Sequence, residues 1–290
     1  MSLVSVYIPT HNRADMLKRA VDSVLKQSYQ NLEIIIVDDG SIDETPNVIN
    51  EYKSIYNNIV SLRNDIPKGA CHSRNRAINI ANGEFITGLD DDDEFESEHI
   101  KTLVENYNNK YSFIASSLKE NDGKNIFIRS DGAGEISLDV LLHYNAVGNQ
   151  VFTKTSYLKE INGFDETLPA LQDYDTWVCL VRRFGGGLKL SSATYIWHTG
   201  HEQNRISNSN SKRLLGLTLF INKHGNLMTE SHNKSMFILR KKIEKTSFSI
   251  FDLVKNINSF NCKSAISLYL NLNLSFISNL WKNMKGKLNK

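Results

Sequence analysis

The sequence predicts an α/β protein built on a doubly wound, mostly parallel β-sheet. Three observations support this fold class. Strand-like and helix-like segments alternate over the first 100 residues, one strand-like segment is almost wholly apolar, and acidic residues directly follow two of the predicted strands. The 290 residues are 40% hydrophobic and 23% charged, close to soluble globular averages, so we expect one large domain or two ordinary ones and no extended disorder.

The first strand and helix are predicted from residue type and spacing. Leu3 to Ile8 is a short β-branched run that ends at Pro9. Asn12 or Asp15 can cap the next helix, where apolar residues recur at helical spacing at Leu17, Val21, Val24 and Leu25.

The following segments repeat the alternation. Residues 32–37 (LEIIIV) are nearly all apolar, as expected of a central parallel strand covered on both faces. We then expect a helix, a strand, a helix and a fourth strand over residues 45–56, 59–63, 73–81 and 84–89.

Acidic residues follow two of these strands. Asp38 and Asp39 follow the second, and the run Asp90–Asp93 follows the fourth. Carboxyl ends of parallel strands share one sheet edge, where ligands bind. An EF-hand is excluded because its positions 6 and 12 would be Phe95 and Lys101. Magnesium takes one or two carboxylates plus substrate phosphates, so the edge predicts a nucleotide diphosphate with a divalent cation; a capped turn and a solvated loop are the alternatives.

Other site types are not supported. The sequence has no GxxxxGK[ST] and no GxSxG, and Leu190 occupies the last position of the GxGxxG that would begin at Gly185. The three cysteines form no CxxC pair, which favours a reducing compartment. We expect neither a secretory signal at the N-terminus nor a spanning helix, since no run of 18 apolar residues occurs.

Charge divides the sequence into two parts. Residues 1–211 hold 20 Lys and Arg against 29 Asp and Glu, a net charge of −9, whereas residues 212–290 hold 14 against 3, a net charge of +11. We therefore expect a domain over 1–211 and a basic, mainly helical extension over 212–290. The extension suits an anionic surface such as lipid headgroups; a solvated helical face is the alternative.

The end of this extension has an amphipathic pattern. Residues 264–281 carry no charge, but seven are polar, so the segment cannot span a bilayer. One helical stripe, flanked by lysines, suits a helix lying in a membrane interface; it contains Ile266, Leu270, Leu274, Ile277, Trp281 and Met284. A helix packed on its own domain or in a dimer, or a strand with alternating leucines from Leu268 to Leu274, are the alternatives.

Four motifs together resemble family 2 glycosyltransferases of the GT-A fold. They are VSVYIPTHNR (4–13), IVDDGS (36–41), GEFITGLDDDD (83–93), and GFDE (163–166) followed by QDYDTW (172–177). They occur in order over residues 1–207. The resemblance implies a nucleotide-binding half and an acceptor half, followed here by the helical extension.

The resemblance also implies roles for single residues on the donor side. Pro9 and Asp39 would line a uracil pocket with Asp38 beside it, and Arg13 and Arg74 would approach the diphosphate.

Further implied roles concern the cation and the reaction. Asp90 and Asp92 would bind Mn²⁺ or Mg²⁺, with Asp91 between them also contacting the cofactor. Asp173 matches the catalytic base, and Asp175 is its rival. His201 or His198 could reach the metal or the diphosphate, whereas His72 and His99 are expected to be structural.

The function that the resemblance implies is inverting transfer of a sugar from a UDP-sugar, and we expect the sugar to be a hexose, glucose or galactose in β linkage. The expected acceptor is a glycan on an undecaprenyl diphosphate carrier in bacterial O-antigen or capsule synthesis. We expect a cytoplasmic protein held at the inner membrane surface through the basic C-terminal region, with no nucleic-acid partner. The alternatives are a nucleotide-sugar-forming nucleotidyltransferase, disfavoured because no glycine follows the first strand, and a non-catalytic binding module.

Overall fold

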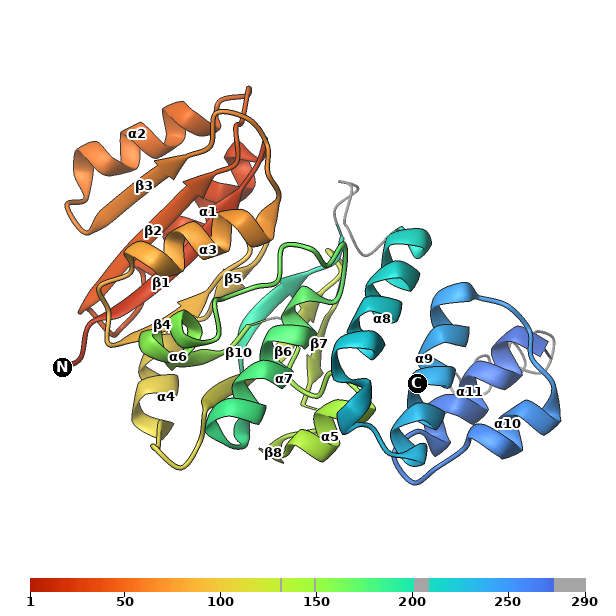
Figure 1. Ribbon diagram of the computed structural model, residues 1–290. Helices are drawn as coiled ribbons and strands as arrows, with labels where there is room; N and C mark the ends of the chain where they lie inside the picture. Colours follow the sequence, from red (N-terminus) through yellow and green to blue (C-terminus); the bar gives the residue numbers. More distant parts are fainter. Residues whose placement is uncertain (131, 149, 201–208, 274–290) are drawn as a thin grey trace. The chain divides into compact units, whose positions relative to one another are not determined.

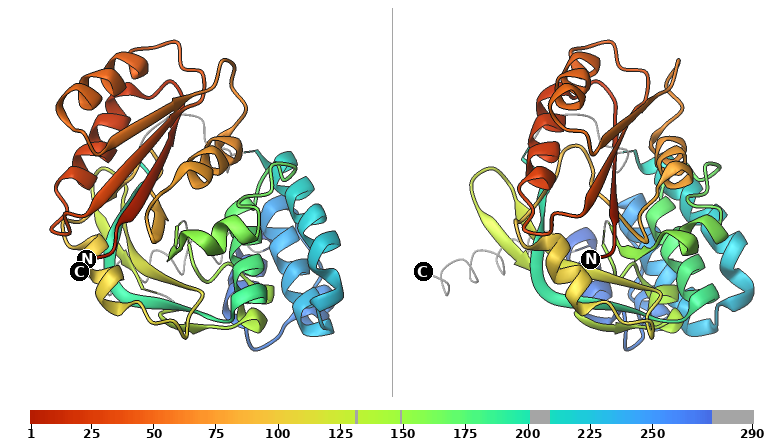
Figure 2. Two further views of the ribbon diagram at one scale, coloured as in Figure 1. Left: turned by 60° about the vertical axis from the view of Figure 1, so that its left-hand side comes forward. Right: turned by 90° about the vertical axis from the view of Figure 1, so that its left-hand side faces the viewer.

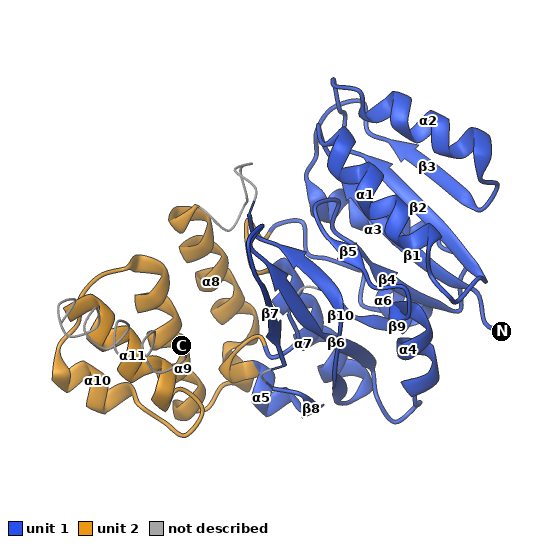
Figure 3. Cartoon of the chain, turned by 180° about the vertical axis from the view of Figure 1, so that it is seen from behind, with its two compact units in different colours: residues 1–141, 146–167, 172–203 blue, residues 142–145, 168–171, 204–290 orange. Residues whose placement is uncertain are grey.

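The structure is a computed structural model that describes residues 1–130, 132–148, 150–200 and 209–273 (Figure 1). The chain forms two compact units (Figure 3). Unit 1 comprises residues 1–141, 146–167 and 172–203, and unit 2 comprises 142–145, 168–171 and 204–290. The charge pattern divides the sequence after residue 211, whereas unit 2 also includes two short earlier segments.

One mixed sheet of ten strands runs through the described part of unit 1, in the order β3-β2-β1-β4-β9-β6-β10-β5, with β7 beside β6 and β8 beside β10. The first four strands are parallel, as predicted: β1 (Val4–Thr10), β2 (Leu32–Asp38), β3 (Ile59–Arg63) and β4 (Phe85–Gly88). The second half contains antiparallel pairs that the sequence did not predict. Its strands are β5 (Glu94–Phe95), β6 (Phe113–Asn121), β7 (Ile126–Arg129), β8 (Gly134–Ile136), β9 (Phe152–Lys154) and β10 (Gly187–His198).

Helices cover both faces of the parallel half, which confirms the doubly wound arrangement. Figure 2 shows α1 and α3 on opposite sides of strands β1 to β3. The helices up to the last strand are α1 (Ala14–Leu25), α2 (Thr45–Ile55), α3 (Ala70–Ile80), α4 (His99–Asn106), α5 (Leu138–His143), α6 (Thr155–Glu160) and α7 (Gln172–Phe184).

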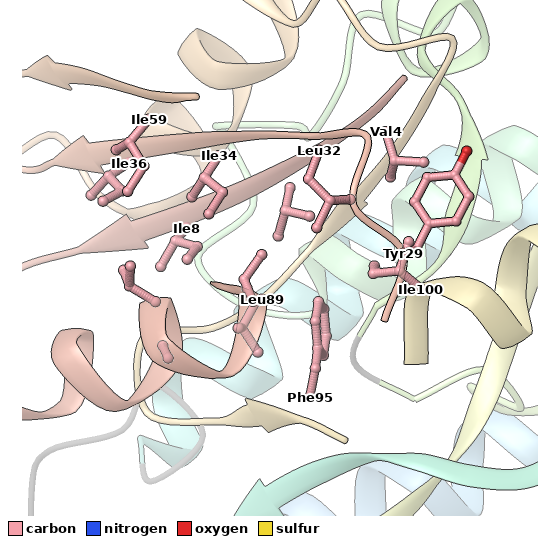
Figure 4. Close-up of a cluster of buried hydrophobic side chains, with 14 of the residues drawn as sticks. Val4, Ile8, Tyr29, Leu32, Ile34, Ile36, Ile59, Leu89, Phe95 and Ile100 are labelled. Carbon is pink, nitrogen blue, oxygen red and sulfur yellow. The ribbon is translucent and has the colours of Figure 1, made fainter. Parts of the chain in front are cut away.

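The core of the parallel half lies between β1, β2 and α1 (Figure 4). Ile8, Ile34 and Ile36 point to this side and are fully buried, together with Val21 of α1. Ile35 is also fully buried, and its side chain points to the opposite face of the strand. The apolar run at 32–37 is therefore buried on both faces, as predicted, and each such side chain contributes about 1.5–3 kcal/mol on burial.

The start of α1 differs from the prediction in two ways. β1 does not end at Pro9, which pairs with Val37. The missing N–H is tolerated there because β4 pairs with β1 only as far as Tyr7, so one side of Pro9 faces no strand. Neither Asn12 nor Asp15 caps α1. Asn12 instead accepts a hydrogen bond from the N–H of Ile42. The side chain of the residue at the N-cap position makes no capping hydrogen bond.

Unit 2 is helical in its described part, as predicted for the extension. Its elements are α8 (Asn210–His224), the 3₁₀ turn η2 (Gly225–Leu227), α9 (Glu230–Glu244), α10 (Ile250–Asn256) and α11 (Cys262–Asn273). The leucines at 268, 270 and 272 lie in a helix and not in a strand. Residues from Leu274 onward, including most of the predicted stripe, lie outside the described residues. Among the described helices, none is long and apolar enough to cross a membrane.

Candidate active site at the carboxyl edge of the parallel strands

The predicted convergence of acidic residues on one sheet edge is confirmed. Thr10 at the end of β1 pairs with Asp38 at the end of β2, and Tyr7 pairs with Gly88 at the end of β4. The side chain of Thr10 then donates a 2.8 Å hydrogen bond to Asp91, 81 residues further along the chain. The ends of β1, β2 and β4 therefore form one site.

Asp39 is held at this edge by three donors. Its carboxylate accepts hydrogen bonds from the side chain of Asn64 at 2.6 Å and from the N–H groups of Lys68 and Gly69 at 2.8 and 2.7 Å. The N–H of Gly69 reaches Asp39 from a backbone φ of +96°, which favours glycine. Burial raises the pKa of Asp39, but the three hydrogen bonds outweigh it and lower the pKa below the ordinary value. The lowered pKa means that Asp39 stays ionised. A carboxylate has about four acceptor positions, so Asp39 can accept one further hydrogen bond from a ring N–H.

Asp38 and Pro9 have different surroundings. Asp38 is buried, pairs with Arg63, and accepts a 2.8 Å hydrogen bond from the N–H of Ser41, so it fixes the turn after β2. Pro9 is buried within β1. Their assignment to the uracil pocket stays a prediction.

The four consecutive aspartates alternate in their contacts. Asp91 accepts hydrogen bonds from Thr10 and from Arg13 at 2.8 Å each. Asp93 accepts a 2.8 Å hydrogen bond from the hydroxyl of Tyr195 and one of 3.0 Å from the N–H of His198. Burial raises the pKa of Asp91 to about 6 and that of Asp93 well above its ordinary value. Asp91 and Asp93 are therefore held by side chains of the protein, and Asp92 is buried beside them while Asp90 is half-buried.

Asp90 and Asp92 form the other pair. Asp90 accepts hydrogen bonds from Arg74 at 2.8 Å and from Gln150 at 3.1 Å, both on Oδ1, so neither bond uses Oδ2. Asp92 lies 3.4 Å from Arg13 as an ion pair. Carboxylate oxygens are hard ligands, and two of them fit Mg²⁺ or Mn²⁺. Such a cation completes its coordination with phosphate oxygens.

Arg74 joins this pair to the predicted base. From α3, its guanidinium lies 2.8 Å from Asp90 and 3.6 Å from Asp173, and it stacks over the ring of Phe164 at 5.2 Å. Burial alone would lower the pKa of Arg74, but Asp90 and Asp173 raise it well above the ordinary value, so the cation is permanent.

Asp173 lies in the first turn of α7 and its side chain is 36% exposed. Desolvation raises its pKa to about 6, which the positive charge of Arg74 partly offsets and the charge of Asp90 reinforces. Asp175, the rival, is 2% exposed. Of the two, Asp173 combines access with contact to Arg74, and this geometry favours it as the base.

The histidines separate into distinct environments. His198 pairs with Glu94 at 2.7 Å, and burial together with the charge of Arg19 lowers its pKa. His72 contacts Glu166 at 3.1 Å, and His99 is buried, which lowers its pKa to about 3. His201 lies outside the described residues.

Gln150 is a site residue that the sequence analysis missed. It is buried, donates to Asp90, and accepts a 2.9 Å hydrogen bond from the hydroxyl of Tyr7. A Cβ at Gly88 would lie 2.3 Å from Gln150 and 2.4 Å from the Tyr7 ring. A glycine inside a strand signals such a close approach, and Gly88 was the available clue.

Comparison with known proteins agrees with this geometry. The sequence model of the family described as glycosyl transferase family 2 matches residues 5–184. The chain is 36% identical over 234 residues to WcaA of Escherichia coli K12, a glycosyl transferase provisionally assigned to colanic acid biosynthesis, covering 77% of this chain and 81% of WcaA.

Two relatives with more specific names match shorter regions. One is the UDP-Glc:α-D-GlcNAc-diphosphoundecaprenol β-1,3-glucosyltransferase WfaP of Escherichia coli, 40% identical over 104 residues. The other is the GalNAc(5)-diNAcBac-PP-undecaprenol β-1,3-glucosyltransferase of Campylobacter jejuni, 35% identical over 125 residues. These matches cover 36% and 42% of this chain, and about two fifths of each relative.

Solved structures share the fold. TarS 1–349 of S. aureus in complex with UDP-GlcNAc superposes with a TM-score of 0.66 at 20% identity, covering 95% of this chain and 80% of that one. The mannosyltransferase PcManGT of Pyrobaculum calidifontis, in complex with GDP-Man and Mn²⁺, gives 0.59 at 14% identity, covering 97% and 84%. The predicted GT-A fold is confirmed.

Proposed function

The chain belongs to glycosyl transferase family 2 and is a glycosyltransferase, and we propose that it moves a hexose from a UDP-sugar to a lipid-diphosphate-linked glycan with inversion at the anomeric carbon. We propose glucose or galactose in β linkage, for bacterial surface polysaccharide synthesis. The names of WfaP and the Campylobacter enzyme support glucose and a polyprenyl diphosphate acceptor, and that of WcaA supports polysaccharide synthesis. Family membership disfavours the nucleotidyltransferase and the non-catalytic module.

The observation that carries this proposal is the position of Arg74 between two carboxylates. Asp90 follows β4, on the proposed donor side, whereas Asp173 lies in the first turn of α7, 83 residues later. One guanidinium contacts both. A donor diphosphate at Asp90 and an acceptor hydroxyl at Asp173 would therefore meet within one site, which supplies the orientation that a single displacement requires.

On the donor side, Asp39 would accept the uracil N–H, and Arg13, from the start of α1, would lie along the diphosphate. Mn²⁺ or Mg²⁺ bound by Asp90 and Asp92 would stabilise the negative charge that develops on the leaving UDP. Thr10 and Arg13 hold Asp91, and Gln150 holds Asp90, so these carboxylates keep their places before the donor binds.

On the acceptor side, Asp173 would take the proton of the attacking hydroxyl. A base with a pKa of about 6 is ionised at neutral pH yet basic enough for this transfer. Inversion requires one attack on the face opposite UDP and no covalent intermediate, so one base suffices.

The basic C-terminal part has a separate proposed role. We propose that it holds the enzyme at the cytoplasmic face of the inner membrane, where a polyprenyl-linked acceptor lies. Its net charge of +11 over residues 212–290 supports this role.

The test is transfer of labelled hexose from UDP-glucose and UDP-galactose to a prenyl-diphosphate-linked acceptor, with Asp173→Asn and, as a matched control, Asp175→Asn. We expect Asp173→Asn to lower kcat about 10²- to 10⁴-fold while UDP still binds, since general base catalysis contributes that much. Full activity in Asp173→Asn, or no transfer by the unaltered protein from either donor, would overturn the proposal.

A further inference from the structure

The short helix α10 presents an apolar face that the described residues of unit 2 leave exposed. Ile250, Phe251 and Val254 are 58%, 72% and 67% exposed. At 100° per residue these positions share one side of the helix with Lys255, which is also exposed. Large apolar side chains exposed together, with a lysine at their border, indicate a surface that contacts something apolar and anionic.

An adjacent side of α10 packs into unit 2. Leu253 and the preceding Phe248 are buried in a small core with Ile238 of α9 and Ala265 of α11. A capping box fixes the first turn, because Ser249 accepts from the N–H of Asp252 and the Asp252 carboxylate accepts from the N–H of Ser249. The exposed face therefore belongs to a helix that is capped and packed within unit 2 (Figure 3).

The described helices of unit 2 carry a net positive charge. Residues 209–273 contain ten Lys and Arg and three Asp and Glu. Glu230 pairs with Lys234 at 2.9 Å, and Glu244 pairs with Lys241 at 3.0 Å. The third acid is Asp252 of the capping box. Because each acid already has a local partner, the surplus charge of unit 2 is positive and complements an anionic surface.

We infer that Ile250, Phe251 and Val254, called here the α10 face, insert into the headgroup region of an anionic lipid bilayer. The inference rests on the proposed function in that it locates the membrane contact of the basic C-terminal part. A second copy of the chain fits the face less well, because three side chains are far from the roughly 1,200–2,000 Å² of a stable interface and two basic surfaces repel each other.

A tryptophan reporter tests insertion directly. Phe251→Trp is mixed with vesicles of phosphatidylglycerol and phosphatidylcholine in equal parts, and with vesicles of phosphatidylcholine alone. The matched control is Ile128→Trp, on an equally exposed apolar position of β7 (66%). We expect a blue shift of the added emission only for Phe251→Trp and only with the anionic vesicles, and weaker binding at 0.5 M salt because exposed charges are screened.

A loss variant measures how much the α10 face contributes. Phe251→Ser with Val254→Ser should lower the fraction that co-sediments with the anionic vesicles at least about tenfold, because two buried apolar side chains are lost. Ile126→Ser with Ile128→Ser on β7 is the control and should co-sediment normally. UDP binding should be unchanged in both, so a failure of the lipid surface and a failure of the proposed transferase activity are distinguishable.

Three results would overturn the inference. The first is equal vesicle binding by the α10 variant and the unaltered protein. The second is emission of Phe251→Trp that is already blue-shifted without vesicles, which would mean that another segment of the chain covers the face. The third is a dimer in sedimentation velocity that the α10 variant dissociates.

Discussion

Three acidic side chains in the site of unit 1 are held differently from two on the helices of unit 2. In the site of unit 1, burial raises the pKa values of Asp91, Asp93 and Asp173. In unit 2, Glu230 is exposed and Glu244 is half-buried, and hydrogen bonds from neighbouring lysines lower the pKa values of both. Both kinds of carboxylate have partners, but only the first kind is kept in an unfavourable environment.

The difference separates carboxylates that serve chemistry from those that serve local helix structure. Crowding and burying acids is unfavourable unless a ligand or cation compensates, and perturbed carboxylates of this kind gather at functional sites. Surface pairs one turn apart on a helix stabilise only slightly. Substitutions in the two groups should therefore differ strongly in effect.

Arg74→Ala should give the largest effect, because it leaves Asp90 and Asp173 without their shared cation. Removing one partner of a buried ion pair costs about 3–5 kcal/mol, and we expect the lower end because both carboxylates are partly exposed. Denaturant unfolding measures this change. Arg74→Lys is the control, and it should recover part of the stability. Unchanged stability in Arg74→Ala would mean that the bridge is not formed.

Gln150→Ala should weaken the metal-dependent binding of UDP about 10- to 100-fold, the range found when an outer partner of a metal ligand is removed. Calorimetry across a Mn²⁺ titration measures the change. Tyr7→Phe removes only the hydroxyl that donates a hydrogen bond to Gln150. It should also weaken the metal-dependent binding of UDP, but by a smaller factor. If both variants bind Mn²⁺ and UDP normally, Gln150 does not position Asp90.

The pH profile of kcat/KM should fall on the acid side of about pH 6. Asp173 acts as a base only when ionised, so the rate is full above its pKa and falls tenfold per pH unit below it. Because the Arg74 charge lowers this pKa, Arg74→Lys, with a weaker contact, should move the acid limb to higher pH. An acid limb that stays in place would assign it to another group.

Glu244→Gln should have the smallest effect. Its pair with Lys241 lies at the helix surface, and such pairs contribute little, so the midpoint of thermal unfolding should change by less than about 2 °C. Differential scanning calorimetry is sufficient. A large decrease would show that the acids of unit 2 are not merely local partners.

The parallel half of the fold was predictable because each of its signals is local. The run at 32–37 has the composition of a buried strand, and acids after two strands must share an edge. The second half of the sheet, which mixes antiparallel pairs with the parallel pair β6–β10, was not predicted. Three of its strands, β5, β8 and β9, have only two or three residues each, too few to show an alternation. The predicted cap of α1 was wrong for a related reason, because the side chain of Asn12 accepts a hydrogen bond from Ile42, a tertiary partner 30 residues away.

The same distinction applies to the site. The sequence motifs predicted Asp39, the aspartate run and Asp173, because the spacing of these motifs can be read directly along the sequence. Gln150 lies 60 residues from Asp90 and 143 from Tyr7, so only the folded sheet brings the three together. The different partners within the aspartate run also required the structure, since Thr10 donates to Asp91 and Tyr195 donates to Asp93.

UDP binding measured by calorimetry, with and without Mn²⁺, tests the central claim that Asp90 and Asp92 hold a cation against a nucleoside diphosphate. We expect binding that requires Mn²⁺ in the unaltered protein and is weakened at least tenfold in Asp92→Ala, with Asp175→Asn as a control that binds normally. Binding of UDP that is equally strong without the metal, or unchanged in Asp92→Ala, would contradict the account.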